Sequence, residues 1–563
     1  MKAKFLALVT ARPYAALALL CLLLWAPGVF FLPATDRDES RFAQSSKQML
    51  ETGDFVDIRF GLTPRYKKPV GIYWMQAATT AVAGLGDKGH IWTYRLPSLL
   101  GAIAAVWLAF WVARSFATVE ASLLAAGLLG STLLLAAEAS IATTDAVLLA
   151  CVMAVQGVLM RAYLAARNTE MPALTLKLAL IGWAVFGLGM LVKGPAVLAA
   201  PAATIFTLIL WDKEWRWLKQ LRPLPGMALA AAIVLPWAVA ILVQTKGAFY
   251  QQSLGDDFAA KLVSDQESHG APPGYYLLLS TLTFWPAILF LLPATVSAIR
   301  RHSEPAIRFL LVWAGATWLL FELVPTKLPH YVLPAYPALA MLAATWALIP
   351  RSEDEPAWQG KLIYVAAIQF ALGVAVLVAA PLILPRLYGA GSAWWLYLTA
   401  AAGLGFGLAA LVLFLRRACV SAFVCSLAAA LIFYPTLTVG TAPRLGQLWV
   451  SQGLASIVKA KSLKGDPPVA LAGYEEPSLI FLLGTDTRIS NAEGAANAAA
   501  TQGGLALVTD EERAAFFAHL AEMEADAERV AELSGLNYSR GRKVHVNVYR
   551  IDAVRQVTSP PPE

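Results

Sequence analysis

Apolar stretches of close to twenty residues recur along the first 440 residues, and short polar turns separate them. About 20 apolar residues cross a bilayer as a helix, so this pattern predicts a polytopic α-helical membrane protein. We expect thirteen spans, at 13–33, 94–116, 119–137, 141–165, 172–192, 195–211, 226–243, 275–299, 306–325, 331–349, 362–385, 393–415 and 418–440. A further stretch, 69–86, is short and carries Gln76, Thr79 and Thr80, so we expect it to lie along the membrane surface.

Beyond residue 440 the long apolar stretches stop, and the pattern becomes that of a small α/β domain. Short apolar runs predict strands at 469–471, 479–483, 505–508 and 544–549, and a period of about 3.6 residues over 510–533 predicts a helix. We therefore expect two domains. These are a membrane domain, 1–440, whose first outer loop is 34–93, and a C-terminal domain, 441–563.

Composition narrows the class of protein, and the charges of the loops predict its orientation in the membrane. Of the 563 residues, 58% are apolar and 14% charged, which excludes a soluble globular enzyme. With a cytoplasmic N-terminus, the inner loops hold fourteen Lys and Arg residues and the short outer loops after the third span hold five. The net charge of +7 is thus an orientation signal, and we expect no nucleic-acid partner. The C-terminal domain is predicted to lie on the outer side.

Unusual ionisable residues collect on that outer side, where they are the default indication of a site. They are Asp36, Arg37, Asp38, Glu39, Arg41, Arg65, Lys67, Lys68, Glu138, Asp145, Lys193, Asp256, Asp257, His269, Lys327 and His330. Lysine and arginine can hold a phosphate leaving group, and a carboxylate can act as general base on an acceptor hydroxyl. No P-loop or dinucleotide-binding glycine motif occurs in context, which disfavours a soluble nucleotide donor. The pattern predicts transfer from a phosphate-bearing membrane donor.

Taken singly, these residues also have purely structural explanations. Asp38 or Ser40 could cap a helix over 42–50, and Lys67 and Lys68 could bind anionic headgroups. Their agreement on one side of the membrane favours a functional site.

The order of the motifs resembles bacterial GT-C glycosyltransferases of the aminoarabinose transferase and protein O-mannosyltransferase group, which is similar to glycosyltransferase family 39. The motifs are Asp38-Glu-Ser-Arg-Phe-Ala43, Tyr66-Lys-Lys-Pro-Val-x2-Tyr-Trp74, Tyr94-Arg-Leu-Pro97, Thr144-Asp145-Ala, Val192-Lys-Gly-Pro195, His269-x3-Pro-x-Tyr-Tyr276 and Lys327-Leu-Pro-x-Tyr-x2-Pro-x-Tyr-Pro337. The resemblance covers 1–440. It implies the GT-C fold with about thirteen transmembrane helices, juxtamembrane helices after the first span, and an outer α/β domain.

The resemblance also implies an activity. Such enzymes take a sugar from a polyprenyl-phosphate carrier at the periplasmic face of the inner membrane and pass it, with inversion, to lipid A, a polysaccharide or a protein. Asp38, Glu39 and Asp145 are the expected catalytic carboxylates. The expected substrate- and phosphate-binding residues are Arg41, Lys67, Lys68, Lys193, His269, Lys327 and Tyr331.

A metal site is not assigned. His269 matches a histidine that resembles a metal ligand in the aminoarabinose enzymes, where an acidic residue partners it. This chain has Lys67 at the partner position, and an ammonium group cannot ligate a metal. A divalent metal would therefore have to rely on His269 without that partner.

Four functions remain open. The first is transfer of an aminoarabinose-, uronic acid- or hexose-type sugar to lipid A or a polysaccharide, and the second is protein O-mannosylation. The third is a non-enzymatic envelope scaffold, which would not need ionisable groups to converge at the outer face. The fourth is a flippase or transporter of lipid-linked sugars. A transporter is expected to show two repeated halves with broken helices, and this sequence shows no such repeat.

Overall fold

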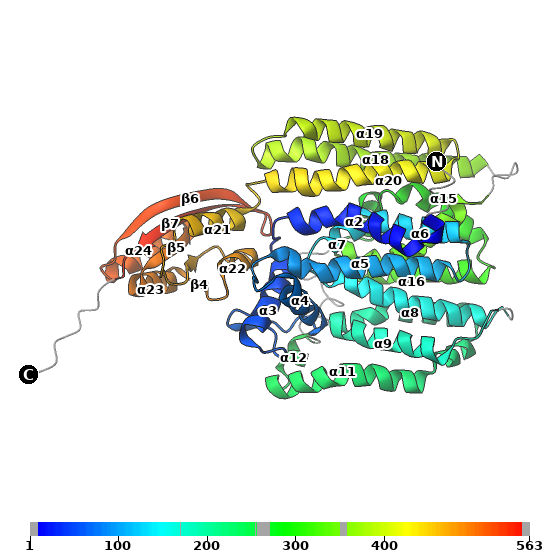
Figure 1. The fold of residues 1–563 in the computed structure, drawn as a ribbon, viewed down its shortest axis with the longest axis horizontal. Coiled ribbons are helices and arrows are strands. Elements are labelled where there is room, and N and C mark those ends of the chain that lie inside the picture. The colour runs from blue at the N-terminus through cyan, green and yellow to red at the C-terminus, as the bar shows by residue number, and fades with distance from the viewer. Residues whose placement is uncertain (1–8, 169–170, 254, 256–270, 350–356, 554–563) are drawn as a thin grey trace, which may run out of the picture.

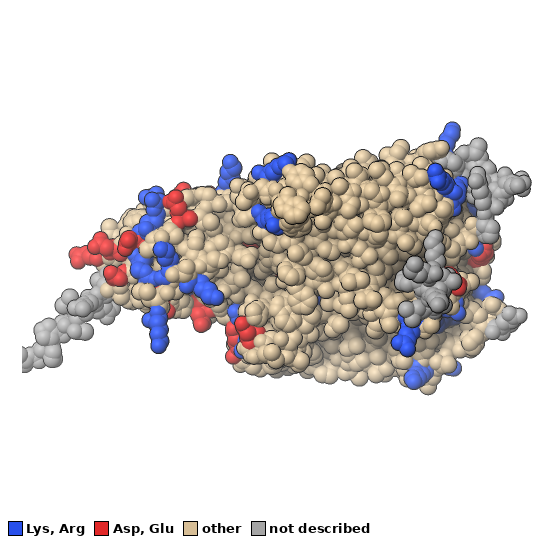
Figure 2. Space-filling view, turned by 45° about the horizontal axis from the view of Figure 1, so that its top comes forward, with Lys and Arg blue, Asp and Glu red and all other residues tan. Residues whose placement is uncertain are grey.

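The structure is a computed structural model that describes residues 9–168, 171–253, 255, 271–349 and 357–553. It consists of a long bundle of helices and a smaller module with a β-sheet that packs against one end of the bundle (Figure 1). On the face shown in Figure 2, the charged residues gather towards the two ends, and the broad surface between them is almost free of charge. An uncharged surface of this kind suits the apolar interior of a bilayer.

Nine helical stretches in the described part of the chain are long and apolar enough to cross a membrane, or ten if the bent pair α6 and α7 is one span. The protein is therefore a multi-pass membrane protein. The helices in these stretches are α2 (Pro13–Phe31), α5 (Ile91–Ala113), α6 (Val119–Ser131), α7 (Leu133–Ala139), α8 (Asp145–Ala165), α9 (Leu176–Lys193), η1 (Gly194–Leu198), α10 (Ala199–Asp212), α11 (Pro223–Thr245), α16 (Pro305–Leu323), α18 (Ala357–Tyr388), α19 (Trp394–Leu415), α20 (Cys419–Pro435), η5 (Thr436–Thr441) and η6 (Ala442–Arg444).

The exact number of spans stays a prediction, because several predicted spans are short or interrupted helices. Residues 275–299 form α14 (Tyr275–Thr283) and α15 (Ile288–Arg300), and 331–349 form η4 (Pro329–Ala335) followed by α17 (Tyr336–Ala347). The helical stretch Leu176–Asp212 contains the predicted span 195–211 and all but the first four residues of the predicted span 172–192.

The chain reverses direction within that stretch. Lys193, the last residue of α9, lies 2.6 Å from Asp145 at the start of α8. Asp212, the last residue of α10, instead accepts a hydrogen bond of 2.7 Å from Tyr163 near the end of α8. The reversal occurs at Gly194, whose φ of +58° is left-handed and suits a glycine. It places Lys193 at the tip of a helical hairpin.

Short elements follow the first span. α3 (Asp38–Thr52) has Asp38 and Glu39 in its first turn, where acids favour a helix because its N-terminus carries positive partial charge. After β1 (Arg59–Phe60) and β2 (Thr63–Pro64) comes α4 (Gly71–Ala83), which has 13 residues and is not among the spanning stretches. This agrees with a surface location for 69–86.

The C-terminal module is a mixed five-stranded sheet in the order β4-β3-β5-β7-β6. β3 pairs in parallel with β4 and β5, and the pairings of β7 with β5 and β6 are antiparallel. Its elements are α21 (Val450–Lys461), β3 (Ala470–Ala472), α22 (Pro477–Leu483), β4 (Arg488–Ser490), α23 (Ala492–Gln502), β5 (Gly504–Thr509), α24 (Asp510–Glu522), β6 (Ala527–Asn537) and β7 (Arg542–Ile551). Three of the predicted strands match β3, β5 and β7.

Two predictions for this module were wrong. Residues 479–483 form helix α22 and not a strand, because Pro477 starts a helix well and a five-residue apolar run does not distinguish the two structures. The helix predicted over 510–533 ends at Glu522, and its second part is strand β6. β6 is an edge strand with many exposed positions, and its pairing with β7 decides its conformation.

Candidate active site

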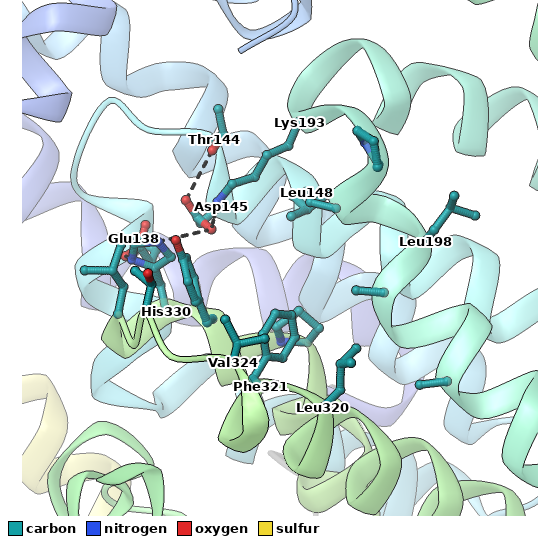
Figure 3. Close-up of a pocket in the computed structure, with 18 of the residues that line it drawn as sticks. Glu138, Thr144, Asp145, Leu148, Lys193, Leu198, Leu320, Phe321, Val324 and His330 are labelled. Carbon is teal, nitrogen blue, oxygen red and sulfur yellow. Dashed lines mark hydrogen bonds and ion pairs between the residues drawn. The ribbon is translucent and has the colours of Figure 1, made fainter. Parts of the chain in front are cut away.

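A cavity of about 1520 Å³ lies inside the helical part, between α3, α8, α9, α10, α16 and η4. One end is lined by charged side chains and the rest mainly by apolar ones (Figure 3). Asp145, Lys193, Glu138 and His330 gather at the charged end, and Leu198 and Leu320 lie away from it. The cavity therefore suits a molecule with an anionic head and an apolar body.

Asp145 is the centre of an ion cluster at the charged end. Its Oδ1 lies 2.6 Å from the Lys193 ammonium and 3.8 Å from His330 Nε2. The other nitrogen of His330 lies 3.6 Å from Glu138, which also accepts a 2.9 Å hydrogen bond from the Thr143 hydroxyl. In Figure 3 Lys193 and His330 approach Asp145 from two different helical segments. Two carboxylates, an ammonium group and an imidazole thus form one connected cluster.

Asp38, the first residue of α3, also lines this cavity. Its side chain is 65% exposed, and Arg65 Nη2 lies 3.6 Å from its carboxylate. The surrounding protein displaces part of the water around Asp38 and so raises its pKa, but the charges of Arg65, Arg41 and other nearby cations outweigh this and leave the pKa below its usual value of 3.8. Asp38 is therefore ionised at neutral pH and accessible from the cavity.

Glu39 lies beside Asp38 but is held differently. Its side chain is only 1% exposed, and Arg95 Nε donates to it at 2.7 Å. It also accepts the backbone N–H groups of Thr35 at 2.9 Å and Ala142 at 2.8 Å. Although burial raises the pKa of Glu39, the charge and hydrogen bond of Arg95 leave it below its usual value. This carboxylate ties α3 to its surroundings.

Further cations surround the space next to Asp38. Arg41, Lys67 and Lys68 all line the cavity, and the Lys68 ammonium donates to the Lys67 carbonyl at 3.1 Å. Tyr331 lies opposite, with the Lys193 ammonium 5.9 Å from its ring centre. Cations from the first outer loop and from α9 thus share one compartment with two acids.

The apolar part of the cavity runs between α10 and α16. Ala199, Ala202, Ala203 and Phe206 line it from α10, and Leu311, Val312, Ala316, Leu319, Leu320 and Leu323 line it from α16. It reaches Trp211 and His302, whose ring centres are 6.1 Å apart. Ala199 and Trp211 are twelve residues apart, so this part is about 18 Å long at 1.5 Å per residue.

The structure brings most of the predicted site residues into this cavity. Its lining includes Asp38, Glu39, Arg41, Lys67, Lys68, Asp145, Lys193 and Tyr331. Lys327 is not part of the lining, since its ammonium is buried and donates to the Val324 carbonyl at 3.0 Å. His269 lies outside the described residues.

Three residues of the charged end were not among the predicted site residues: Glu138, His330 and Arg65. All three belong to the ionisable residues predicted on the outer side, and this membership is the sequence signal that could have identified them as site residues. Only the fold shows that His330 bridges Glu138 and Asp145 and that Arg65 faces Asp38. Within the described part of the chain, no group of three or more His, Cys, Asp or Glu side chains is arranged to hold a metal ion.

Comparison with known proteins agrees with this fold and these motifs. A family model described as dolichyl-phosphate-mannose-protein mannosyltransferase matches residues 67–239. The undecaprenyl phosphate-alpha-4-amino-4-deoxy-L-arabinose arabinosyl transferase 2 of Pseudomonas fluorescens is 30% identical over 317 residues, which are 54% of each chain. A corresponding transferase of Pseudomonas paraeruginosa is 28% identical over 57% of this chain. The chain thus spans about half the length of the curated relatives it matches.

The crystal structure of ArnT from Cupriavidus metallidurans bound to undecaprenyl phosphate superimposes with a TM-score of 0.74. It covers 95% of this chain at 18% sequence identity. The archaeal oligosaccharyltransferase AglB from Archaeoglobus fulgidus gives a TM-score of 0.50. The chain has the GT-C fold, with a small C-terminal sheet domain, and the resemblance inferred from the motifs is confirmed.

Proposed function

We propose that this chain is a glycosyltransferase that takes a sugar from a polyprenyl-phosphate donor and passes it to lipid A or a polysaccharide. The shape and the lining of the cavity are the observations that support this proposal. A compartment with Lys68, Lys67 and Lys193 continues into an apolar channel between α10 and α16. A phosphate with an isoprenoid tail matches both parts, because cations bind the phosphate and the tail replaces water along the channel.

The relatives support the same donor class. Those named above are transferases whose names include undecaprenyl phosphate, and the ArnT structure holds that lipid. A sugar of the aminoarabinose, uronic acid or hexose type fits the proposal.

The proposed reaction is a direct displacement with inversion. The acceptor hydroxyl oxygen bonds to the anomeric carbon, and the bond from that carbon to the phosphate oxygen breaks. The electron pair of that bond leaves with the polyprenyl phosphate, whose charge Lys68 and Lys67 offset. Asp38 accepts the hydroxyl proton. Because its pKa is low, Asp38 is a weak base, so we expect the proton to move late, as the new bond forms.

The other acids have supporting roles in this proposal. Asp145 binds the Lys193 ammonium, and His330 lies between Asp145 and Glu138, in contact with both carboxylates. Glu39 anchors the first turn of α3 and thereby orients Asp38 without contacting the substrate, since its side chain is engaged by Arg95.

We place the site at the periplasmic face of the bacterial inner membrane. The excess of Lys and Arg in the alternate loops supports a cytoplasmic N-terminus. With that orientation the charged end of the cavity and the C-terminal domain face the periplasm.

Protein O-mannosylation is the second candidate. The description of the matching family model supports it, since that family is named for mannose transfer to protein. The two candidates share the donor chemistry and differ in the acceptor.

Deleting the gene should remove a sugar from one class of envelope molecule. We expect mass spectrometry of lipid A and polysaccharide from the deletion strain to show loss of one glycosyl mass, with periplasmic proteins unchanged. Restoring the gene should restore that mass, and the Asp38→Asn variant should not. Loss of hexose from periplasmic proteins alone would establish the second candidate. No change in any envelope glycan would refute transferase function.

Replacing Lys68 by alanine should weaken binding of the carrier phosphate. A hydrogen bond to a charged group contributes about 1.5–3 kcal/mol, so Kd for undecaprenyl phosphate should rise roughly 10- to 100-fold. Calorimetric titration of the purified protein measures this.

The matched control is Lys88→Ala. Lys88 lies in the same outer loop, donates to the Leu50 carbonyl at 3.2 Å and does not line the cavity. Its Kd should equal that of the unmodified protein. An unchanged Kd in Lys68→Ala would refute the assignment of Lys68 to the phosphate.

A further inference from the structure

The C-terminal domain touches the segment that leads directly into Asp38. The Asp36 N–H donates to the Tyr538 hydroxyl at 2.7 Å, and the Arg37 guanidinium donates to the Ser539 carbonyl. The hydroxyl of Ser478 donates to the Asp36 carboxylate. Two consecutive residues are therefore held by another domain, and Asp38 is the next residue in the chain.

The part of the C-terminal domain that makes these contacts is itself well anchored. Tyr538 and Ser539 lie in the turn between β6 and β7. Glu476, just before α22, accepts hydrogen bonds of 2.7 Å from Ser539 of that turn and from Asn537, the last residue of β6. The Tyr538 ring packs edge-on against Trp449 with ring centres 6.0 Å apart. The three contacts to Asp36 and Arg37 thus come from one part of the C-terminal domain, in which the turn and the start of α22 are held together by hydrogen bonds.

Helix α22 connects this region to the membrane part. The side chain of Phe481 is fully buried, in a cluster with Ala43 of α3 and Tyr94 of α5. Its ring centre lies 5.5 Å from that of Tyr94. Gln44 of α3 donates to the Thr485 hydroxyl at 2.7 Å. The domain is therefore packed against α3 along its length and not only at its start.

The backbone of Arg37 needs such support. Its φ is +62° and its ψ is −113°, a conformation that costs free energy for any residue except glycine. A strained residue persists only where its surroundings fix it. Here, the residue is flanked by the contacts from Ser478, Tyr538 and Ser539.

The carboxyl group of Asp36 is enclosed by the same contact. Burial raises its pKa to about 6, more than the hydrogen bond from Ser478 lowers it, and Glu476 raises it further. This environment exists only while the two domains are in contact.

From this geometry we infer that the C-terminal domain is a positioning element for the active site. Ser478, Tyr538 and Ser539 fix the backbone of Asp36 and Arg37, and this backbone determines the direction in which Asp38 enters the cavity. Tyr538 and Ser478 are positioning residues, since they act through Asp36. The catalytic consequence of this inference rests on the proposed transferase function.

Tyr538→Phe tests the inference, because it removes the hydroxyl that accepts the Asp36 N–H and keeps the ring on Trp449. Hydrogen–deuterium exchange of residues 35–41 should become about 10-fold faster in Tyr538→Phe and in Ser478→Ala. In a transfer assay with undecaprenyl-phosphate-linked aminoarabinose, kcat should fall about 10-fold while KM for the donor changes less than about 2-fold. Because both contacts act through Asp36, their effects are not independent, and the double variant should lose at least as much kcat as either single variant.

Tyr549→Phe is the matched control. Tyr549 lies on β7 of the same domain, and its buried hydroxyl has no hydrogen-bond partner among the described residues. Exchange and kcat should stay unchanged in this variant. Thermal melting checks that all variants remain folded.

Two results would overturn the inference. If exchange of 35–41 is unchanged in Tyr538→Phe, the domain does not fix this segment. If exchange is faster but kcat is unchanged, the contact is structural only. Should the unmodified protein transfer no sugar from any lipid-linked donor, the proposed function fails, and the exchange result then decides alone whether the domain fixes the segment.

Discussion

Replacing Asp38 by asparagine should lower kcat for glycosyl transfer about 10²- to 10⁴-fold while the protein still folds. Asparagine keeps the shape of the side chain but cannot accept a proton, and general base catalysis contributes about this factor. The Asp38 side chain is 65% exposed, so the new amide is not buried, but Arg65, whose side chain is only 7% exposed, loses its counter-charge. Thermal melting therefore checks that the variant is folded. A transfer assay with a purified polyprenyl-phosphate-linked sugar and lipid A measures the loss.

The donor should still bind to this variant. Kd for undecaprenyl phosphate should remain within about 3-fold, because Lys68 and Lys67 are unchanged. Asp87→Asn serves as the control, since Asp87 is 60% exposed, lies in the same outer loop and is not in the lining of the cavity. If Asp38→Asn retains full kcat, Asp38 is not the base, and Asp145 becomes the residue to test.

The pH dependence of the reaction offers a separate check on Asp38. A carboxylate whose pKa lies below 3.8 stays ionised at and above about pH 5. Protonation would remove the base, so kcat/KM falls only as the pH drops through that low pKa. We therefore expect no acid limb from this residue between about pH 5 and pH 8.

The second large effect is on stability and concerns Arg95. Replacing it by leucine should destabilise the fold by about 3–5 kcal/mol, because Glu39 would remain buried without its counter-charge. The guanidinium also donates to the Leu32 carbonyl at 2.7 Å and to the Pro33 carbonyl at 2.8 Å, just beyond the end of α2. Those acceptors would lose their partners as well. Chemical denaturation in detergent, or the yield of folded protein, measures the change.

An exposed ion pair gives the comparison. Arg529 and Glu532 lie 2.8 Å apart in the C-terminal domain, and their side chains are 51% and 53% exposed. Arg529→Leu should cost less than about 1 kcal/mol, since surface pairs contribute little. A double variant, Arg95→Leu with Glu39→Leu, should recover part of the stability of Arg95→Leu. An Arg95→Leu protein as stable as the unmodified one would show that the buried pair does not hold α3.

Much of the fold could be predicted from the sequence because the bilayer imposes a simple rule. Apolar length and loop charge predicted the helical membrane class, and the motif order predicted the GT-C fold. The interrupted helices were harder. The chain bends by 65° between α6 and α7 inside one apolar stretch, and hydropathy does not detect such a bend because both sides of it are apolar.

In the candidate site, the sequence could predict only those residues that a local sequence pattern marks. Asp38, Lys68 and Lys193 lie close to the ends of apolar stretches, so the sequence pattern predicted them outside the spans, on the outer side. Glu138 and His330 meet only in the tertiary structure, where η4 packs against α7 and α8. The contact between the C-terminal domain and Asp36 joins residues 502 positions apart, and no local pattern indicates it.

That long separation has a consequence for biogenesis. The ribosome delivers the first loop early and the turn between β6 and β7 among the last parts of the chain, and domains fold as they emerge. Tyr538 cannot meet Asp36 until nearly all of the helices have entered the membrane. On the inference that this domain positions Asp38, a nascent or truncated chain that lacks the turn holds its Asp38 segment incompletely, and we expect the proposed transfer to reach its full rate only at the final stage of assembly.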